Sequence, residues 1–277
     1  MGRPPFLRAV SHFMAVGMAV GVVALAAPAA AAANPACGAT LTSSVKLTGD
    51  MSCSGTALTV GKPGITINLN GYTLSGSGEL NGYYGVYNDG YNKVTVENGT
   101  IEDYDYGLLD EYTTGAKVVD LKANHDFEAI DVWYSQTGLV EHSSVHDDEY
   151  GTYLYENNRV NVTDSKATDS DYGIFDYDSL ATLDKVKSLD NDYGFYIDYP
   201  LRLGKSYYTI EKSIADNNYD SGFYIENYQT LYSQADLLSN TANDNSEYGF
   251  YAELKTKGKG NHATGNGTAN CFNVSCS

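Results

Sequence analysis

Positive charge is scarce in this sequence of 277 residues. It contains 17 lysine and arginine residues against 35 aspartate and glutamate residues, which gives a formal net charge of −18 at pH 7. A chain this acidic repels nucleic acids and anionic membrane surfaces at long range. Polyanionic substrates are disfavoured for the same reason, unless a bound cation or a local basic stripe intervenes. The composition therefore predicts that the protein has no nucleic-acid partner.

The chain also lacks a hydrophobic run long enough to span a membrane as a helix, which takes roughly 20 apolar residues. Its longest apolar stretch, residues 13–27, follows the cationic residues Arg3 and Arg8 and leads into an alanine-rich segment. This order of segments predicts a secretory signal peptide over residues 1–33, cleaved after its last alanine. We therefore expect residues 34–277 to form a secreted, extracellular protein with no membrane insertion after cleavage.

Cysteine is rare and lies in two close pairs at the ends of the exported region, at Cys37, Cys53, Cys271 and Cys276. No histidine lies near either pair at a spacing typical of zinc ligands, so a zinc site is disfavoured. Export favours oxidation of cysteine, and the close pairs indicate one disulfide bond near each terminus. Four cysteines allow three pairings, and the sequence leaves all three open.

What the sequence does contain is a repeat of 22 residues. Its anchor is a small residue, usually a glycine after a tyrosine, and successive anchors are separated by 22, 22, 22, 22, 21, 28 and 27 residues. The two longest intervals indicate ordinary repeats that carry inserted loops. The anchors are Gly85, Gly107, Ala129, Gly151, Gly173, Gly194, Gly222 and Gly249.

Each repeat reads as three short strands. The residue after the anchor is almost always apolar, and short alternating runs rich in valine follow it. Alternation with a period of two favours β-strands, and Asp, Asn and Gly turns separate the runs. This pattern does not fit helical repeats, and the columns that define leucine-rich repeats are missing. Because one unit cannot bury its apolar side alone, the units must stack as coils of an all-β solenoid.

Two segments precede the regular repeats: CGATLTSSVKLTGDMSC at residues 37–53 and GITINLNGYTLSG at residues 64–76. Together with the repeat, they resemble the opening coils of secreted bacterial proteins of the pectate-lyase-like superfamily. The resemblance implies a right-handed parallel β-helix of about 9–10 coils, with roughly 22 residues in each. It implies one domain with N-terminal coils and a cap (34–80), repeat coils (81–260) and a C-terminal cap (261–277).

Aromatic residues that point outward are the first candidate for function. Because side chains alternate across a strand, the residues two and four positions after each anchor should point away from the core. They are Tyr87 and Asp89, Leu109 and Glu111, Asp131 and Trp133, Tyr153 and Tyr155, Phe175 and Tyr177, Tyr196 and Asp198, Tyr224 and Glu226, and Tyr251 and Glu253. The tyrosines directly before the anchors are expected to form a structural stack at a corner of the coil.

Rigid aromatic rings beside carboxylates suit a sugar ring or a protein partner. A tyrosine-rich face with no ligand would give the same pattern, so both interpretations stay open. The ligand-binding candidates are Trp133, Tyr153, Tyr155, Phe175, Tyr177, Tyr196 and Tyr224.

A second candidate is a turn that carries histidine and aspartate in adjacent repeats. His125 and Asp126 occupy the same repeat positions as Asp147 and Asp148, and His146 directly precedes the latter pair. Carboxylates beside an imidazole can perform acid–base catalysis or bind a cation such as calcium. Other repeats have aspartate at the same turn without histidine, so these residues also fit ordinary turn formation.

Motifs of the enzymes in the resembled superfamily are largely missing. Of the NTD, DD, GHG and RIK set of polygalacturonase-like members, only Asp147-Asp148 matches, and the Asp-Pro-His-Asp signature of alginate epimerases is absent. Pectate lyases need an arginine beside a calcium-binding acidic cluster, and neither Arg159 nor Arg202 is so placed. The first hypothesis is therefore a non-catalytic protein that binds a polysaccharide or an extracellular protein, or is structural. The alternative is a polysaccharide lyase or glycoside hydrolase that acts through acidic residues. No cofactor is expected, and calcium is the one candidate under this alternative.

Overall fold

The computed structural model describes residues 33–78, 81–199, 206–227 and 233–277. The chain from Ala32 onward forms a single compact unit. The predicted signal peptide lies, apart from Ala33, outside the described residues. Residues 200–205 and 228–232, which fall in the two longest repeats, also lie outside them.

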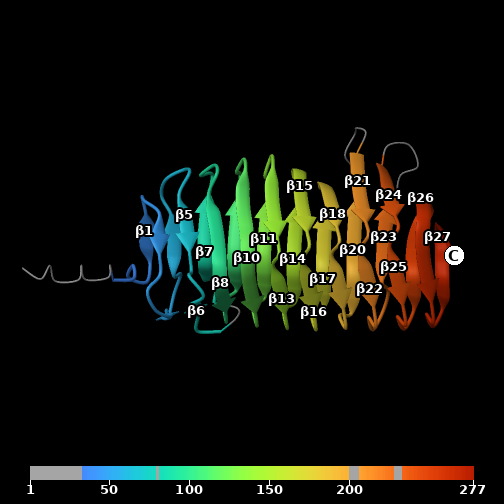
Figure 1. Ribbon diagram of the computed structural model, residues 1–277, viewed down its shortest axis with the longest axis horizontal. Coiled ribbons are helices and arrows are strands. Elements are labelled where there is room, and N and C mark those ends of the chain that lie inside the picture. Colours follow the sequence, from blue (N-terminus) through green and yellow to red (C-terminus); the bar gives the residue numbers. More distant parts are fainter. Residues whose placement is uncertain (1–32, 79–80, 200–205, 228–232) are drawn as a thin grey trace, which may run out of the picture. The chain divides into compact units, whose positions relative to one another are not determined.

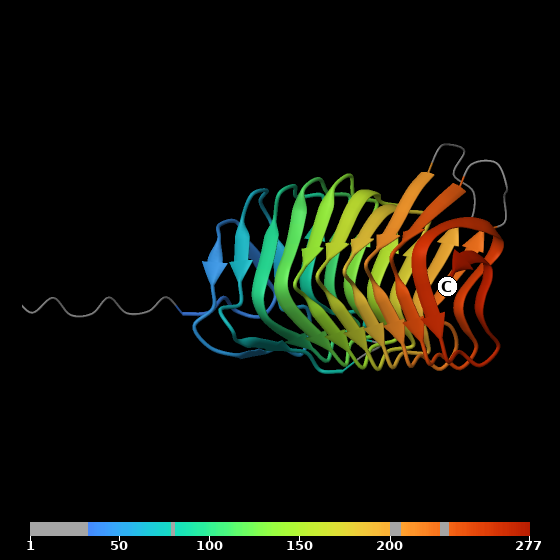
Figure 2. The same ribbon diagram turned by 45° about the vertical axis from the view of Figure 1, so that its right-hand side comes forward.

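The unit is an all-β solenoid of about 10 turns with about 22 residues per turn, as the repeat predicts. Its strands form three columns that run side by side along the long axis, from the N-terminal coils in blue to the C-terminal coils in red (Figures 1 and 2). Neighbouring strands within each column pair in parallel, for example β14 with β17 and β15 with β18. Strands in the two longest repeats keep this pairing, because β20 pairs with β23 and β21 with β24.

Column 1 consists of β1 (Ala39–Leu41), β4 (Leu58–Val60), β7 (Tyr84–Asp89), β9 (Tyr106–Glu111), β11 (Glu128–Trp133), β14 (Tyr150–Tyr155), β17 (Tyr172–Tyr177), β20 (Tyr193–Tyr199), β23 (Phe223–Asn227), the start of β26 (Tyr248–Thr264) and β27 (Ala269–Cys276). Column 2 consists of β2 (Val45–Lys46), β5 (Thr66–Asn68), β8 (Thr95–Glu102), β10 (Ala116–Asn124), β12 (Gly138–Glu141), β15 (Asn158–Thr163), β18 (Leu180–Asp184), β21 (Ser206–Glu211), β24 (Ser233–Leu238) and the middle of β26. Column 3 consists of β3 (Met51–Ser52), β6 (Thr73–Ser75), the ends of β8 and β10, β13 (Ser144–His146), β16 (Lys166–Thr168), β19 (Lys187–Leu189), β22 (Ile214–Asp216), β25 (Thr241–Asn243) and the end of β26.

The core runs through the centre of the solenoid and is built from same-position stacks. The residues directly after the anchors are all buried, as predicted: Val86, Leu108, Ile130, Thr152, Ile174, Phe195, Phe223 and Phe250. The phenylalanine rings stack with centroid distances of 4.5 Å and 4.7 Å, which matches the spacing of paired strands. Each coil therefore buries its apolar side against the coils before and after it.

Residues around the anchor glycine alternate between buried and outward positions, and the anchor itself has no room for a larger side chain. In β14, Gly151 and Thr152 are both buried, whereas Tyr150 and Tyr153 are both half-exposed. A Cβ atom added at Gly151 would lie 2.7 Å from the carbonyl oxygen of Gly173 in the next coil. The anchor must be small because the backbones of adjacent coils approach closely there.

Buried polar side chains form ladders at the turns between columns. In each ladder, a side chain accepts a hydrogen bond from a backbone N–H one coil earlier, such as Tyr104 N–H to Asp126 Oδ1 (2.7 Å) and Asn191 N–H to Asn218 Oδ1 (3.1 Å). These bonds pair backbone groups that would otherwise be buried without partners. The ladder between columns 3 and 1 contains Asp126, Asp148, Ser170, Asn191, Asn218, Asn245 and Asn266.

Counting four residues back from each anchor, which reaches His125 from Ala129, misplaces two of these residues. The count puts Asn218 and Asn245 in the same column as His125, but the residues with positive φ at that turn are Asn217 (61°) and Asp244 (56°). Asn218 and Asn245 are the next residues along the chain, and their side chains point into the ladder. One extra residue before the last two anchors causes the shift.

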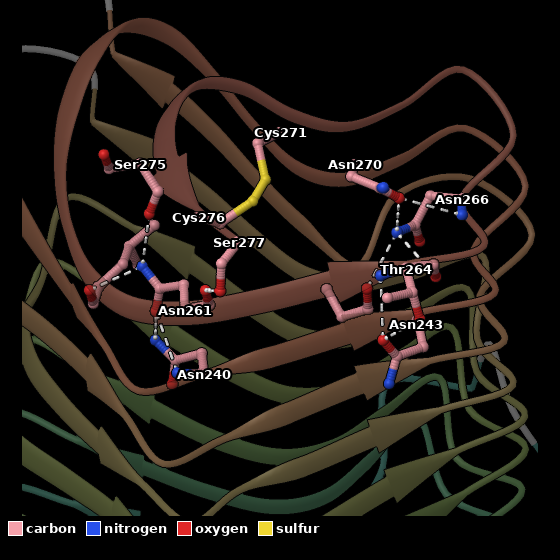
Figure 3. Close-up of a disulfide and its surroundings, with 12 residues drawn as sticks. Asn240, Asn243, Asn261, Thr264, Asn266, Asn270, Cys271, Ser275, Cys276 and Ser277 are labelled. Atoms are coloured by element: carbon pink, nitrogen blue, oxygen red, sulfur yellow. Dashed lines mark hydrogen bonds between the residues drawn. A yellow bond between two sulfur atoms is a disulfide. The ribbon is translucent and has the colours of Figure 1, made fainter.

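Disulfide bonds lie at both ends of the solenoid and settle the pairing that the sequence leaves open. Cys37 bonds to Cys53 and Cys271 bonds to Cys276, with Cα–Cα distances of 5.6 Å and 6.3 Å. Figure 3 shows the second bond above Asn261, whose side chain continues the ladder from Asn240. Each disulfide bond therefore cross-links a terminal coil, which has a neighbouring coil on one side only.

Candidate ligand-binding face

The outward side chains of β7, β9, β11, β14, β17, β20, β23 and the first part of β26 form a surface that we term the aromatic face. One row in it consists of the tyrosines that precede the anchors. Tyr150, Tyr172 and Tyr193 stack with centroid distances of 5.1 Å and 5.5 Å and with interplanar angles of 7°. This row is the structural stack that the sequence predicts.

A second row lies beside the first. The rings of Phe175, Tyr196, Tyr224 and Tyr251 stack with centroid distances of 5.3 Å, 5.0 Å and 4.7 Å. The two rows touch, because Tyr150 lies 5.3 Å from Tyr153 within one strand. The aromatic face is therefore wider than the sequence predicts, since it includes the tyrosines before the anchors.

Ring orientation decides what the face can offer to a ligand. Rings stacked at these distances cover one another's faces, so they present their edges and phenol hydroxyl groups to solvent. The exception is the region of β11 and β14. There Trp133 meets Tyr106 and Tyr153 edge to face, at 6.2 Å and 5.9 Å, and is tilted by 51° to Tyr155.

The structure places the predicted ligand-binding residues on one surface. Trp133, Tyr153, Tyr155, Phe175, Tyr177, Tyr196 and Tyr224 are all partly exposed, and an unbroken series of ring contacts from Trp133 to Tyr153, Phe175, Tyr196 and Tyr224 joins most of them. Two other residues predicted to point to solvent are buried. Leu109 is 3% exposed and Asp131 is 0% exposed.

Strand β11 interrupts both rows with carboxyl groups. Glu128 pairs in register with Tyr106 and Tyr150, and Asp131 pairs with Leu109 and Tyr153. Both are buried, at 7% and 0% exposure. The rings of Tyr106 and Tyr153 in the neighbouring strands each contact Trp133, and both phenol groups lie close enough to the carboxyl pair for Glu128 and Asp131 to raise their pKa.

Burial and mutual repulsion strongly favour protonation of this pair. Burial raises the pKa of Glu128, and burial together with the nearby Glu128 carboxylate raises the pKa of Asp131 further. Among the described residues, neither oxygen of the Asp131 carboxyl group has a hydrogen-bond partner. The nearby Glu128 carboxylate therefore further disfavours a negative charge on Asp131. The sequence pattern shows the interruption, since β11 has Glu, Ala and Asp where other repeats have Tyr, Gly and Tyr, but only the structure shows the burial.

The histidine and aspartate residues of the predicted catalytic turn do not converge on one point. His125, His146 and Asp147 are exposed, with His125 Nε2 3.3 Å from Asp147 Oδ2. Asp126 and Asp148 are buried members of the ladder, and Asp126 N–H donates to Asp148 Oδ1 at 2.8 Å. The two sets lie on opposite sides of the turn because the residues before Asp126 and Asp148 have positive φ, 55° and 60°.

No metal site is evident in the described part of the chain. Residues 33–78, 81–199, 206–227 and 233–277 contain no group of three or more His, Cys, Asp or Glu side chains placed to hold a metal ion. The calcium expected under the enzyme hypothesis therefore stays a prediction without an assigned site. In the same residues, no helix is long and apolar enough to cross a membrane.

Comparison with known proteins identifies the family. The family described as right handed beta helix region matches residues 45–185, and this protein belongs to that family. The resemblance to the pectate-lyase-like superfamily is thereby confirmed at the level of the fold. No curated protein sequence matches the chain.

Several solved structures are similar to this chain at low sequence identity. The catalytic domain of a GH87 α-1,3-glucanase in complex with tetrasaccharides superposes with a TM-score of 0.55 at 11% identity, over 85% of this chain and 60% of the glucanase chain. Pectate lyase Pel9A gives a TM-score of 0.49 at 13% identity, over 86% of this chain and 67% of the lyase. An alginate lyase from Paenibacillus sp. gives 0.48 at 14% identity, over 83% and 89%. This chain therefore spans about 60% of the glucanase domain that it matches.

Proposed function

We propose that this protein is an exported carbohydrate-binding protein that holds a glycan along the aromatic face. One observation carries the proposal: partly exposed aromatic side chains follow one another without interruption from β11 to β26 on a single side of the solenoid. A protein rarely leaves so long an aromatic surface exposed unless it binds something there. Export follows from the predicted signal peptide, and the two disulfide bonds fit an oxidising compartment.

The face offers two kinds of contact that suit a sugar chain. Rows of phenol edges, such as those of Tyr155 and Tyr177 with centroids 5.0 Å apart, supply hydroxyl groups that donate to and accept from sugar hydroxyls. Trp133, which is not stacked flat against another ring, supplies a ring face for the apolar side of a sugar. The bound tetrasaccharides of the GH87 glucanase structure show a carbohydrate on a protein of this fold.

Affinity gel electrophoresis against a panel of soluble polysaccharides tests the proposal. We expect at least one polysaccharide to retard the protein, and the double variant Tyr155→Ser/Tyr177→Ser to lose most of that retardation. Both side chains lie on the outward side of the strands, so removing them leaves the core intact. The matched control is Tyr219→Ser, because Tyr219 is 74% exposed but lies outside the aromatic face.

Each outcome bears on the proposal directly. Loss of retardation in the double variant, with the control unchanged, supports binding at the aromatic face. Retardation that is equal in all three proteins would place the binding site elsewhere and contradict the proposal. Circular dichroism of each variant confirms that the fold is kept.

A second candidate function, a polysaccharide lyase or hydrolase, is favoured by the carboxyl pair of β11. Burial raises the pKa of both Glu128 and Asp131, and a protonated and an ionised carboxyl group side by side can act as general acid and general base.

Product analysis separates this candidate from pure binding. The protein is incubated with neutral and uronate polysaccharides, with and without calcium, and unsaturated or reducing-end products are measured. Products that vanish in Glu128→Gln and Asp131→Asn, while binding persists, would establish the enzyme. Full activity in both variants would exclude the pair as its catalytic residues.

A further inference from the structure

Strand β11 interrupts the aromatic face, because it alone among the described strands of that face has no ring in either row. Glu128 and Asp131 occupy its positions in the two rows. Trp133, two residues further along β11, contacts Tyr106 of β9 and Tyr153 of β14, with centroid distances of 6.2 Å and 5.9 Å. Within the face, Trp133 therefore joins the rings that precede β11 to the rings that follow it.

The same strand carries buried polar atoms without partners. Asp131 is 0% exposed and Glu128 is 7% exposed. Among the described residues, neither oxygen of Asp131, nor Oε2 of Glu128, nor Nε1 of Trp133 has a hydrogen-bond partner. Folded proteins pair nearly all of their buried polar groups, so a cluster of unpaired ones needs a reason. A buried carboxyl group without donors is tolerated while it is protonated and neutral, but not when it is ionised.

The titratable groups around the carboxyl pair are acids and phenols. Burial, and then the carboxylates near the pair, raise the pKa of Glu128 and of Asp131. Strands β9, β11 and β14 contain no lysine, arginine or histidine. His125 lies in the turn before β11, where it is exposed and its Nε2 lies 3.3 Å from Asp147 Oδ2. The surrounding groups are Asp105, Tyr106 and Glu111 from β9 and its turn, Glu149, Tyr150 and Tyr153 from β14 and its turn, and Asp126 and Asp148 from the ladder.

We propose that the carboxyl pair of β11 acts as a proton-operated switch for the aromatic face. The inference rests on the proposed carbohydrate-binding function and names a regulation of that site. The protonated pair keeps the face closed and able to bind a glycan, with Trp133 in contact with Tyr106 and Tyr153 as in the structure. When a proton leaves for the solvent, the carboxylate that remains needs water, because no donor among the described residues reaches the oxygens of Asp131. Hydration opens the face at Trp133.

Trp133 is the ring of the face that gives way to this water. Rings in the regular rows stack flat, for example Tyr150 on Tyr172 with an interplanar angle of 7°. The ring of Trp133 meets those of Tyr106 and Tyr153 edge to face, at 89° and 73°, and its Nε1 bonds to no described residue. Its displacement therefore breaks ring contacts but no hydrogen bond of the indole. A buried carboxylate without partners is costlier than the loss of those contacts, so ionisation favours the open state.

The sign of the pKa shifts sets the direction of the pH effect. Because burial raises the pKa of Glu128 and of Asp131, the protonated, closed state is complete in weak acid and is lost as the pH rises through neutrality. The neighbouring phenol stays protonated in this range, since burial raises the pKa of Tyr106 to about 12. Above the pKa of the pair, the closed fraction falls about tenfold for each pH unit, and the apparent affinity for a glycan falls with it.

Fluorescence of the full chain tests the switch without a ligand, because Trp133 is its only tryptophan. We expect acrylamide to quench Trp133 weakly in weak acid and more strongly above a transition at about pH 7 or higher. The emission should shift to longer wavelength in the same transition, as water reaches the indole. In Glu128→Gln/Asp131→Asn the transition should be absent, and circular dichroism checks that this variant folds.

The matched control is His125→Asn. It removes a group that titrates in the same pH range, and asparagine accepts the positive φ of 55° at this position. Because His125 is exposed and faces Asp147, we expect the fluorescence transition to persist unchanged in this variant.

Affinity gel electrophoresis measures the consequence for binding. It uses a neutral polysaccharide that retards the protein, since the charge of such a ligand does not change with pH. Mobility is compared with that in a gel without polysaccharide. From about pH 5.5 to about pH 8.5 we expect the wild-type protein to lose most of its retardation, whereas Glu128→Gln/Asp131→Asn keeps it at both values.

The outcomes separate this inference from the proposed function. Quenching that stays constant from weak acid to weak base would overturn the switch, whatever the variants do, and would leave carbohydrate binding intact. A transition that persists in the double variant, or disappears in His125→Asn, would belong to other groups and would also overturn the inference. The same holds for a transition that leaves the retardation unchanged. Retardation by no polysaccharide at any pH would overturn the proposed function, and its regulation with it.

Discussion

Strands β11 and β17 occupy the same column two coils apart, and both bury carboxyl groups in different ways. In β17 the side chain of Asp176 points inward, where its Oδ1 accepts a hydrogen bond of 2.9 Å from the Ser179 N–H. In β11 the buried carboxyl groups of Glu128 and Asp131 lie on the outward side, and neither oxygen of Asp131 has a hydrogen-bond partner among the described residues. The outward side of β17 keeps the regular Tyr172 and Phe175.

The difference shows what each position of the repeat requires. An inward acid is tolerated where the turn supplies donors, and the hydroxyl groups of Ser179 and Tyr208 also approach Asp176. An outward acid replaces a ring that would stack on its neighbours, and in β11 Trp133 is the residue that contacts the rings of Tyr106 and Tyr153 on either side. The fold is preserved in both cases, but in β11 the buried carboxyl groups lie within the aromatic face.

The largest effect that we expect from this comparison is on the pH dependence of stability. Burial raises the pKa of Asp176 to about 8 and that of Asp110 to about 6, and burial raises the pKa of the β11 pair as well. Between the ordinary carboxyl pKa near 4 and these raised values, the folded protein keeps protons that the unfolded chain releases. The free energy of unfolding should therefore fall as the pH rises from 4 to 8, by about 1.4 kcal/mol for each unit of pKa shift.

Chemical denaturation at a series of pH values checks this expectation. Asp176→Asn should flatten the curve up to pH 8, whereas Glu128→Gln/Asp131→Asn should remove a separate part of the slope. Asp89→Asn, at an exposed residue of β7, is the control and should leave the slope unchanged. A wild-type stability that stays constant or rises from pH 5 to 8 would contradict the protonated state of these carboxyl groups.

A smaller effect on the free energy of unfolding is expected from exchanging the anchor residues of β14, Gly151, and of β11, Ala129. In Gly151→Ala the new Cβ would lie 2.7 Å from the Gly173 oxygen and 2.7 Å from Val145 Cγ2, and the backbone oxygen has no room to move. We expect a loss of about 1–3 kcal/mol in the free energy of unfolding. Ala129→Gly in β11 should cost only about 0.5–1 kcal/mol, because it adds freedom to the unfolded chain without a clash. Equal losses in the two variants would show that close coil contact does not select the anchor.

Much of the architecture was predictable from the sequence because the repeat is regular. The anchor interval, the apolar column after it and the alternation of strands determine coil length, core and outward face. The outward positions of Tyr155 and Tyr177 follow from alternation alone. The two disulfide pairs could not be deduced from spacing, since closeness in sequence does not decide among three pairings.

The carboxyl pair of β11 was beyond prediction because burial of an outward residue depends on its neighbours. Alternation places Asp131 on the solvent side, yet Asp131 is fully buried, and the neighbouring strands place Tyr106 beside Glu128 and Tyr153 beside Asp131. The sequence also could not predict that Asp126 and Asp148 belong to the ladder, because the sequence around a turn aspartate does not show whether its side chain faces solvent or the ladder. Only the positive φ of the preceding residue separates the two cases.

The smallest effect should come from replacing Asp126, the buried ladder residue at the start of the β11 coil. The ladder residue of the β17 coil is Ser170, and the later coils have asparagine from Asn191 onward. Asn218→Ala would leave the buried Asn191 N–H without an acceptor and should cost about 1–3 kcal/mol of unfolding free energy. Asp126→Asn keeps the acceptor for the Tyr104 N–H and removes a carboxylate that raises the pKa of Asp131. We therefore expect Asp126→Asn to unfold at the wild-type temperature or slightly above it. A large loss of stability in that variant would mean that the charge of Asp126, and not its geometry as an acceptor, supports the β11 coil.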